Sequence, residues 1–167
     1  VTRLEAGDYP AQRRLILEEL AAHQLSLFRL RAESDRQRAP VLAAATALTQ
    51  QLLATLPFTP TGAQQRVVAE IEADLARNKP MMRLVQGDVG SGKTLVAALA
   101  ALTAIGNGYQ VAVMAPTELL AEQHALNFGQ WLAPLGLAVM PLLGKQGSKA
   151  RREALSAIAD GSAQLVT

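Results

Sequence analysis

The first part of the chain carries hydrophobic residues at the spacing of an amphipathic helix. Four leucines follow this period: Leu17, Leu20, Leu27 and Leu30. The helix is expected to begin at Asp8-Tyr9-Pro10, because a proline ring presets the backbone of a first helical turn. Charged residues at 29–38 predict a solvated helix end or a loop, and an alanine-rich pattern at 41–56 predicts a second helix.

Prolines and a glycine interrupt this helical pattern, and they predict a boundary between residues 57 and 58. Beyond it, short apolar runs that predict buried strands alternate with helical patterns. The runs lie at 81–86, 111–115, 137–143 and 163–167, and the helical patterns lie at 94–105, 117–131 and 148–160. This alternation predicts an α/β fold with a parallel sheet and helices on both of its faces.

Composition narrows the class of protein further. The chain has 167 residues, half of them apolar, and no apolar run long enough to span a bilayer. It contains no cysteine, which excludes disulfides and cysteine-bound metals and suits a cytoplasmic location. The net charge of +2 permits nucleic-acid binding without arguing for it. Because the chain does not begin with Met and stops inside an apparent strand, we expect a piece of a longer protein.

A glycine-rich segment lies between the first predicted strand and the helix after it. It reads Gly87-Asp88-Val89-Gly90-Ser91-Gly92-Lys93-Thr94, which matches the P-loop pattern of Gly, four residues, then Gly-Lys-Ser/Thr. Glycines let the backbone turn its N–H groups toward phosphate oxygens, and the positive end of the next helix faces the anion. We expect Lys93 to reach the β- and γ-phosphates of ATP and the Thr94 hydroxyl to bind Mg²⁺. A plain glycine-rich turn is the weaker alternative.

Two residues ahead of the P-loop are candidates for contact with adenine. The Gln64 amide offers a donor beside an acceptor, which match the N6 and N7 positions of the base. Phe58 is placed to stack on or near the base. Thr61 and Gln64 also have the spacing of a helix capping box, and on pattern alone this structural role is favoured.

Two later segments are candidates for binding a nucleic-acid backbone. Thr117 follows the second predicted strand, at a helix start whose N–H groups can hold a phosphate, although helix capping explains it equally well. The flexible loop that begins at Gly144 carries four cations and no acid up to Arg152. Lys145 and Lys149 within it are expected to follow a phosphate backbone, and a solvated basic loop is the alternative.

Taken together, these segments resemble the superfamily 2 helicases. The P-loop at 87–94 resembles their motif I, and Phe58 with Gln64 resembles their adenine-reading Q motif. Residues 115–124 resemble motif Ia, which contacts the DNA backbone in that superfamily. The most similar group within it is the RecG family of bacterial branched-DNA helicases, and this resemblance covers nearly the whole chain.

Three segments favour the RecG family over its relatives. They are 83–94, 114–124, and Arg13-Arg14-Leu15 with Glu18-Glu19-Leu20, which resembles the family's segment between a DNA-splitting wedge domain and the motor. There are two departures. Pro60 precedes Thr61 where many members carry Leu, and Leu143-Gly144-Lys145 lacks the hydroxyl side chains of the family's Thr-Gly-Ser, which weakens the case for a phosphate contact there.

The resemblance implies a helical linker between wedge and motor at 1–57, and the front part of a first RecA-like ATP-binding lobe at 58–167. It implies an ATP-dependent DNA helicase that remodels stalled forks and recombination junctions, with single-stranded DNA-binding protein as a further partner. The family's acidic motif and arginine finger are expected beyond Thr167, so the chain alone is predicted to be inactive. The alternatives are a transcription-repair coupling translocase and a P-loop NTPase of another class.

Overall fold

The computed structural model describes residues 9–167, apart from the side chains of residues 34 and 35. Asp8 and the rest of the predicted linker ahead of Tyr9 lie outside the described residues. The elements are α2 (Pro10–Arg36), α3 (Thr46–Thr55), α4 (Gly62–Leu75), α5 (Lys93–Gly106), β1 (Val111–Ala112), α6 (Glu118–Leu132), η1 (Ala133–Leu135), β2 (Val139–Met140), α7 (Ser148–Ala159) and β3 (Leu165–Val166). No described helix is long and apolar enough to cross a membrane.

The chain forms two compact units. The first contains α2 and the residues that follow it to Pro40, together with Asn78–Pro80. The second contains Val41–Arg77 and Met81–Thr167. The boundary that the sequence predicts between residues 57 and 58 falls inside the second unit, because α3 packs into the core of that unit.

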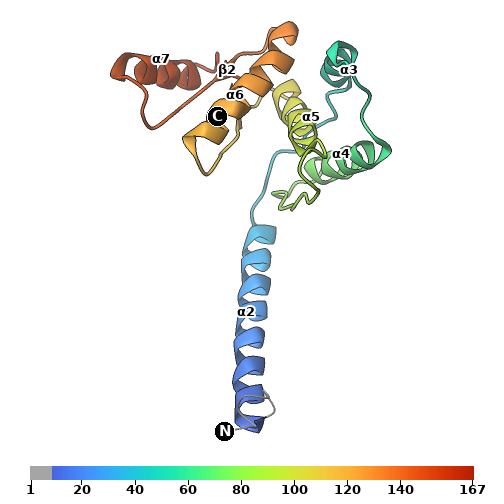
Figure 1. Ribbon diagram of the computed structural model, residues 1–167. Helices are drawn as coiled ribbons and strands as arrows, with labels where there is room; N and C mark the ends of the chain where they lie inside the picture. The colour runs from blue at the N-terminus through green and yellow to red at the C-terminus, as the bar shows by residue number, and fades with distance from the viewer. Residues whose placement is uncertain (1–8) are drawn as a thin grey trace. The chain divides into compact units, whose positions relative to one another are not determined.

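In the first unit, α2 is a single helix of 27 residues (Figure 1). It continues through most of the charged stretch that predicts a helix end or loop, and it ends at Arg36. The four leucines that set its predicted period are all exposed. Arg14 and Glu18, one helical turn apart, form an ion pair at 2.9 Å on its surface.

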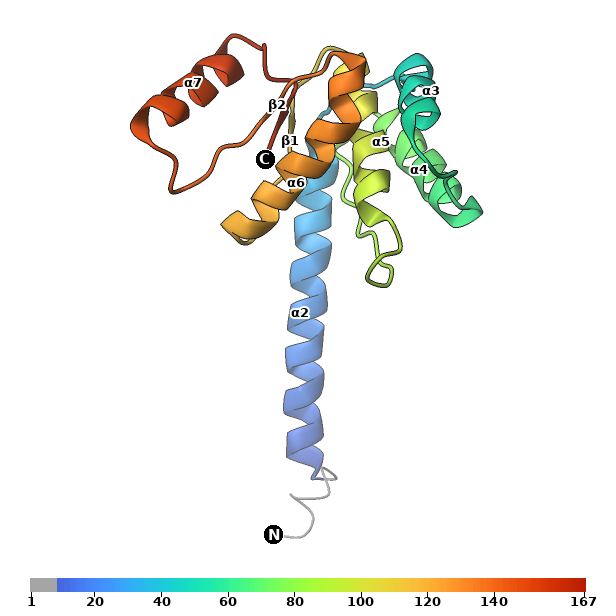
Figure 2. The same cartoon turned by 45° about the horizontal axis from the view of Figure 1, so that its top comes forward.

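The second unit contains a three-stranded parallel sheet with the strand order β1-β3-β2. Leu165 of the central strand is paired in register with Val111 on one side and Val139 on the other. The chain moves from β1 to β2 through α6 and returns to β3 through α7. Because parallel crossovers are right-handed, these opposite directions place α6 and α7 on opposite faces. Figures 1 and 2 show the strands between α7 and the pair α5 and α6, which confirms the predicted α/β arrangement.

The core of this unit is built around α5. Its Ala/Leu-rich sequence is apolar around most of the helix, which is typical of a buried helix. Its buried residues are Leu95, Val96, Ala98, Leu99, Ala101, Leu102, Thr103 and Ile105. Most of them pack in one cluster with Leu52 of α3, Ile71 of α4, Phe128 of α6 and Leu165 of β3. The cluster therefore fixes the start of α5, where the P-loop ends, against the rest of the unit.

The second helix begins later than the sequence predicts. It starts at Thr46 rather than near residue 41, because residues 41–45 have no regular secondary structure. The Leu42 N–H donates to the Leu75 carbonyl oxygen at 3.0 Å, and the Leu42 side chain is buried. These contacts hold the segment against the end of α4, so residues 41–45 do not form a helix although their sequence pattern predicts one. The strands, of two residues each, are also shorter than the runs that predict them.

The run at 81–86 has no regular secondary structure and does not join the sheet. Met81 and Val85 pack against the core, whereas Met82 and Leu84 are 87% and 81% exposed. Partly buried and exposed apolar side chains are thus mixed along the run. A strand needs a hydrogen-bonded neighbour, and within the described residues the sheet contains only the three strands named above.

Candidate nucleotide site and nucleic-acid interface

Residues 87–94 form a tight turn that leads into α5. Gly90 and Gly92 have φ angles of 81° and 80°, in the left-handed region that residues other than glycine rarely adopt. The Ser91 N–H donates to the Asp88 carbonyl oxygen at 3.1 Å and closes the turn, and Gly92 is the N-cap of α5. A glycine-rich turn at a helix start can hold a phosphate group through backbone N–H donors.

Two glycines of this turn leave no room for a side chain. A Cβ atom on Gly87 would lie 2.7 Å from the Ser91 hydroxyl oxygen. A Cβ atom on Gly92 would overlap the side-chain amide nitrogen of Gln64. Close packing therefore disfavours a side chain at both positions unless Ser91 or Gln64 moves, and at Gly92 the positive φ disfavours it as well.

The Lys93 ammonium lies over the backbone of the turn. It donates to the carbonyl oxygens of Gly87 and Asp88, both at 2.7 Å. Thr94 follows in the first turn of α5 and is half-buried. A cation and a hydroxyl thus project from adjacent positions beside the loop, which is the donor set that a nucleoside triphosphate with Mg²⁺ would need. In the described part of the chain, no group of three or more His, Asp or Glu side chains could hold a metal ion by itself.

Gln64 connects the start of α4 to the P-loop. Its N–H donates to the Thr61 hydroxyl at 3.3 Å and its side-chain oxygen accepts the Thr61 N–H at 2.7 Å, so the predicted capping box is present. Its side-chain nitrogen donates to the Ser91 carbonyl oxygen at 2.8 Å, a contact that the sequence did not predict. Phe58, the other predicted adenine contact, is 49% exposed.

Arg83 ties the run ahead of the P-loop to α4. Its Nε and Nη2 atoms lie 2.9 and 2.6 Å from Asp74 Oδ2, and its Nη1 atom lies 2.5 Å from Glu70 Oε2. These two carboxylates, Asp74 first, raise the pKa of Arg83 above its ordinary value, so the guanidinium stays charged. The run at 81–86 is therefore anchored by an ion pair as well as by its apolar side chains.

The two predicted nucleic-acid segments lie at one edge of the sheet. Thr117 follows β1 and the loop at 141–147 follows β2, and the carboxyl ends of parallel strands meet at the same edge. The Thr117 hydroxyl accepts the Leu120 N–H at 3.4 Å and caps α6, as one of the two predicted roles requires.

Glu118 brings these two segments together. Its Oε1 atom accepts the backbone N–H of Lys145 at 2.8 Å, and its Oε2 atom lies 3.4 Å from the Lys145 ammonium. The basic loop has no acid in its own sequence, because its acidic partner comes from α6. A pairing across 27 positions leaves no local signal in the sequence.

Gln146 also forms hydrogen bonds within the basic loop. Its side-chain oxygen accepts the Leu143 N–H at 3.2 Å, and its side-chain nitrogen donates to the Pro141 carbonyl oxygen at 2.9 Å. Gln146 and Glu118 thus contact the loop backbone at several points, and the flexibility of the loop stays a prediction. Lys149 lies on the first turn of α7, 4.0 Å from Glu153 of the same helix.

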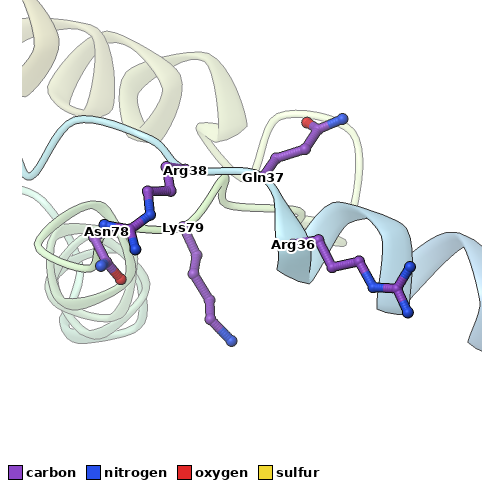
Figure 3. A pocket seen from close by; sticks show the side chains of 5 residues that line it. All are labelled: Arg36, Gln37, Arg38, Asn78 and Lys79. Carbon is purple, nitrogen blue, oxygen red and sulfur yellow. The ribbon is translucent and has the colours of Figure 1, made fainter.

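A shallow, largely polar pocket lies within the first unit. Its lining residues are Arg36, Gln37, Arg38, Asn78 and Lys79. Figure 3 shows that these side chains do not point toward a common centre: Arg38 and Asn78 extend to one side and Arg36 to the other. The pocket therefore lacks the convergent polar groups of a ligand site.

A profile of the DEAD/DEAH box helicase family matches residues 61–167. The chain is 66% identical to the ATP-dependent DNA helicase RecG of Escherichia coli (strain K12) over 163 residues, which are 98% of this chain and 24% of that protein. It is 59% identical to RecG of Haemophilus influenzae, with the same coverage of 98% and 24%. RecG of Aquifex aeolicus is 40% identical over 90% of this chain and 19% of its own length. The chain thus spans about a quarter of the length of the first curated relatives it matches.

A solved structure, described as RecG bound to a three-way DNA junction, has the same fold. It matches with a TM-score of 0.83 at 35% identity, over 93% of this chain and 22% of that chain. The predicted resemblance and the predicted RecA-like fold class are both confirmed by these similarities.

Proposed function

Because this chain belongs to the DEAD/DEAH box helicase family, we propose that it is the nucleotide-binding part of an ATP-dependent DNA helicase that remodels branched DNA. Stalled replication forks and recombination junctions are the substrates we propose, and this activity belongs to the intact protein that contains the chain. Residues 58–167 form the front part of its first RecA-like lobe in this proposal, and residues 1–57 form the linker from a wedge domain. The cytoplasm is the proposed location, and single-stranded DNA-binding protein is a proposed partner.

The observation that carries the proposal is the position of Lys93 over the P-loop turn. Its ammonium is 2.7 Å from two loop carbonyl oxygens, and it can exchange these for phosphate oxygens without leaving the loop. In the proposed complex, the backbone of 87–92 surrounds the β-phosphate, Lys93 neutralises the β- and γ-phosphates, and the Thr94 hydroxyl is one ligand of Mg²⁺. The bound metal supplies charge neutralisation on the phosphates.

Adenine is proposed to lie beside Gln64 and Phe58. Gln64 already contacts the P-loop through Ser91, so a base next to its amide would be on the same side of the unit as the phosphates. The amide keeps one free hydrogen and one free lone pair after its two contacts, and these suit the N6 and N7 edge of adenine.

The DNA backbone is proposed to contact Thr117, Lys145 and Lys149. The first two lie at the same edge of the sheet and are connected through Glu118. The side chains of Lys145 and Lys149 are 90% and 89% exposed, so both ammonium groups can reach a phosphate.

The experiment that tests the proposal is Lys93→Ala in the intact protein. The substitution removes the cation for the γ-phosphate and leaves the glycines of the turn, so folding should be preserved. ATP hydrolysis and unwinding of a three-way DNA junction should fall by at least about a hundredfold, the scale on which removal of one transition-state charge partner acts. A circular dichroism melt checks the fold. Turnover equal to that of the wild type would contradict the P-loop assignment.

A further inference from the structure

Glu118 joins two segments that the proposed function assigns to DNA. Its carboxylate accepts the Lys145 backbone N–H at 2.8 Å and pairs with the Lys145 ammonium at 3.4 Å. The side chain of Glu118 is 37% exposed, whereas that of Lys145 is 90% exposed. The carboxylate is therefore partly shielded by the loop, while the ammonium extends into solvent.

The loop is shaped to receive this carboxylate. A Cβ atom on Gly144 would lie 2.9 Å from Glu118 Oε1, so the close approach depends on glycine at this position. Gln146 closes the loop on its other side through Leu143 and Pro141. The backbone N–H of Lys145 is thus directed at α6 by the fold of the loop itself.

An acid on a DNA-binding surface is otherwise unfavourable, because it repels phosphate. The hydrogen bond from the Lys145 backbone N–H to Glu118 explains why an acid is present. This bond fixes the position of the loop backbone and does not only neutralise the charge of a side chain. A phosphate contact from a loop that is already ordered avoids the entropy cost of ordering it on binding.

We infer that Glu118 is a positioning residue for DNA binding: it fixes the loop after β2 to the start of α6, so that Thr117 and Lys145 present one surface to a phosphate backbone. The inference rests on the proposed function. Glu118 itself does not contact DNA in this inference. It affects DNA binding by fixing the position of the loop.

Two substitutions of Glu118 separate this role from simple repulsion. Glu118→Gln keeps an oxygen that can accept the Lys145 N–H and releases the ammonium, so affinity for a fluorescent three-way DNA junction should rise about two- to threefold. The slope of the logarithm of DNA affinity against the logarithm of salt concentration should steepen by about one unit, because one more cation becomes available to phosphate. Glu118→Ala removes the tether, and affinity should fall on the order of fivefold despite the lost acid. Glu122→Ala, one helical turn further along α6, is the charge-matched control and should not weaken binding.

The same contact can be broken from the loop. Gly144→Ala places a methyl group against the Glu118 carboxylate, and that flexible side chain can move away without disrupting the fold. It should reproduce the loss seen with Glu118→Ala, and the double variant should bind no more weakly than either single variant. Gly147→Ala is the matched control in the same loop, because nothing lies within 4 Å of its Cβ position and its φ of −59° suits alanine.

Hydrogen exchange of the Lys145 amide tests the tether without DNA. It should be slow in the wild type and in Glu118→Gln, and fast in Glu118→Ala and Gly144→Ala. Tighter DNA binding by both Glu118 variants would overturn the inference, since that is the result of repulsion alone, and so would unchanged affinity in both. A wild-type protein that protects this amide but does not bind DNA would instead overturn the proposed function.

Discussion

Gln64 uses both ends of its side-chain amide. The oxygen accepts the Thr61 N–H and the nitrogen donates to the Ser91 carbonyl oxygen, at 2.7 and 2.8 Å. The capping role that the sequence pattern favours is therefore present, and the proposed adenine role requires only the remaining hydrogen and lone pair. A single side chain thus links the stability of α4 to the shape of the nucleotide loop.

Gln64→Ala should affect both properties. Loss of the capping box should lower the free energy of unfolding by about 1 kcal/mol, measured by urea titration. Loss of the proposed base contact should weaken binding of ATP more than binding of inorganic triphosphate, measured by isothermal titration calorimetry.

Thr61→Ala is the matched control for this prediction. It removes the hydroxyl that caps α4 and leaves the Gln64 amide on Ser91. It should lose a similar amount of stability and keep the preference for ATP over GTP. If both variants keep that preference, Gln64 is a cap alone and the adenine role is wrong.

At the scale of elements, the ion pairs of Arg83 connect α4 to the run that leads into the P-loop. Arg83→Met should keep the aliphatic stem and lose the tether, so the amides of residues 81–86 should exchange several-fold faster with solvent. ATP affinity should fall, because the segment that leads into the P-loop is no longer anchored to α4. Arg77→Met is the control, because Arg77 also pairs with Asp74 but lies outside that run and has a side chain that is 70% exposed. Equal exchange in both variants would show that Met81 and Val85 hold the run without Arg83.

Local patterns in the sequence predicted most elements of the fold. The periods at 94–105, 117–131 and 148–160 correspond to α5, α6 and α7, and the parallel sheet follows from their alternation with apolar runs. The P-loop was found because its glycines and lysine are close together in the chain.

The contacts that organise the candidate sites join distant positions. Gln64 with Ser91 and Glu118 with Lys145 are each 27 residues apart, so no periodicity or local motif records them. The start of α3 was misplaced for the same reason. Leu42 donates a backbone hydrogen bond to Leu75, a residue far along the chain, and this contact keeps Leu42 out of the helix.

At the scale of the whole molecule, the proposed function gives the chain a nucleotide-binding loop and two groups for hydrolysis, Lys93 and Thr94. Phosphoryl transfer also needs acids that hold the metal, a positioned water and a cation for the developing charge. Asp88 lies within the P-loop itself, and Glu118 is paired with Lys145. An arginine finger alone contributes about 10³–10⁵ in rate.

The 167-residue chain by itself should therefore bind ATP weakly and hydrolyse it no faster than its Lys93→Ala variant, with or without DNA. A coupled-enzyme assay of phosphate release checks this, with the intact protein as the positive control. Hydrolysis by the chain clearly above the variant would show that the catalytic groups lie within these residues.

Two exposed apolar side chains of the run at 81–86 affect the behaviour of the chain in solution. Met82 and Leu84 are mostly exposed, and in the described residues the run is paired with no strand of the sheet. An unpaired segment of this kind can pair with another segment, including the same run of a second molecule. Self-association of the isolated chain should therefore increase with concentration and should begin at this run, while the core around α5 is still folded.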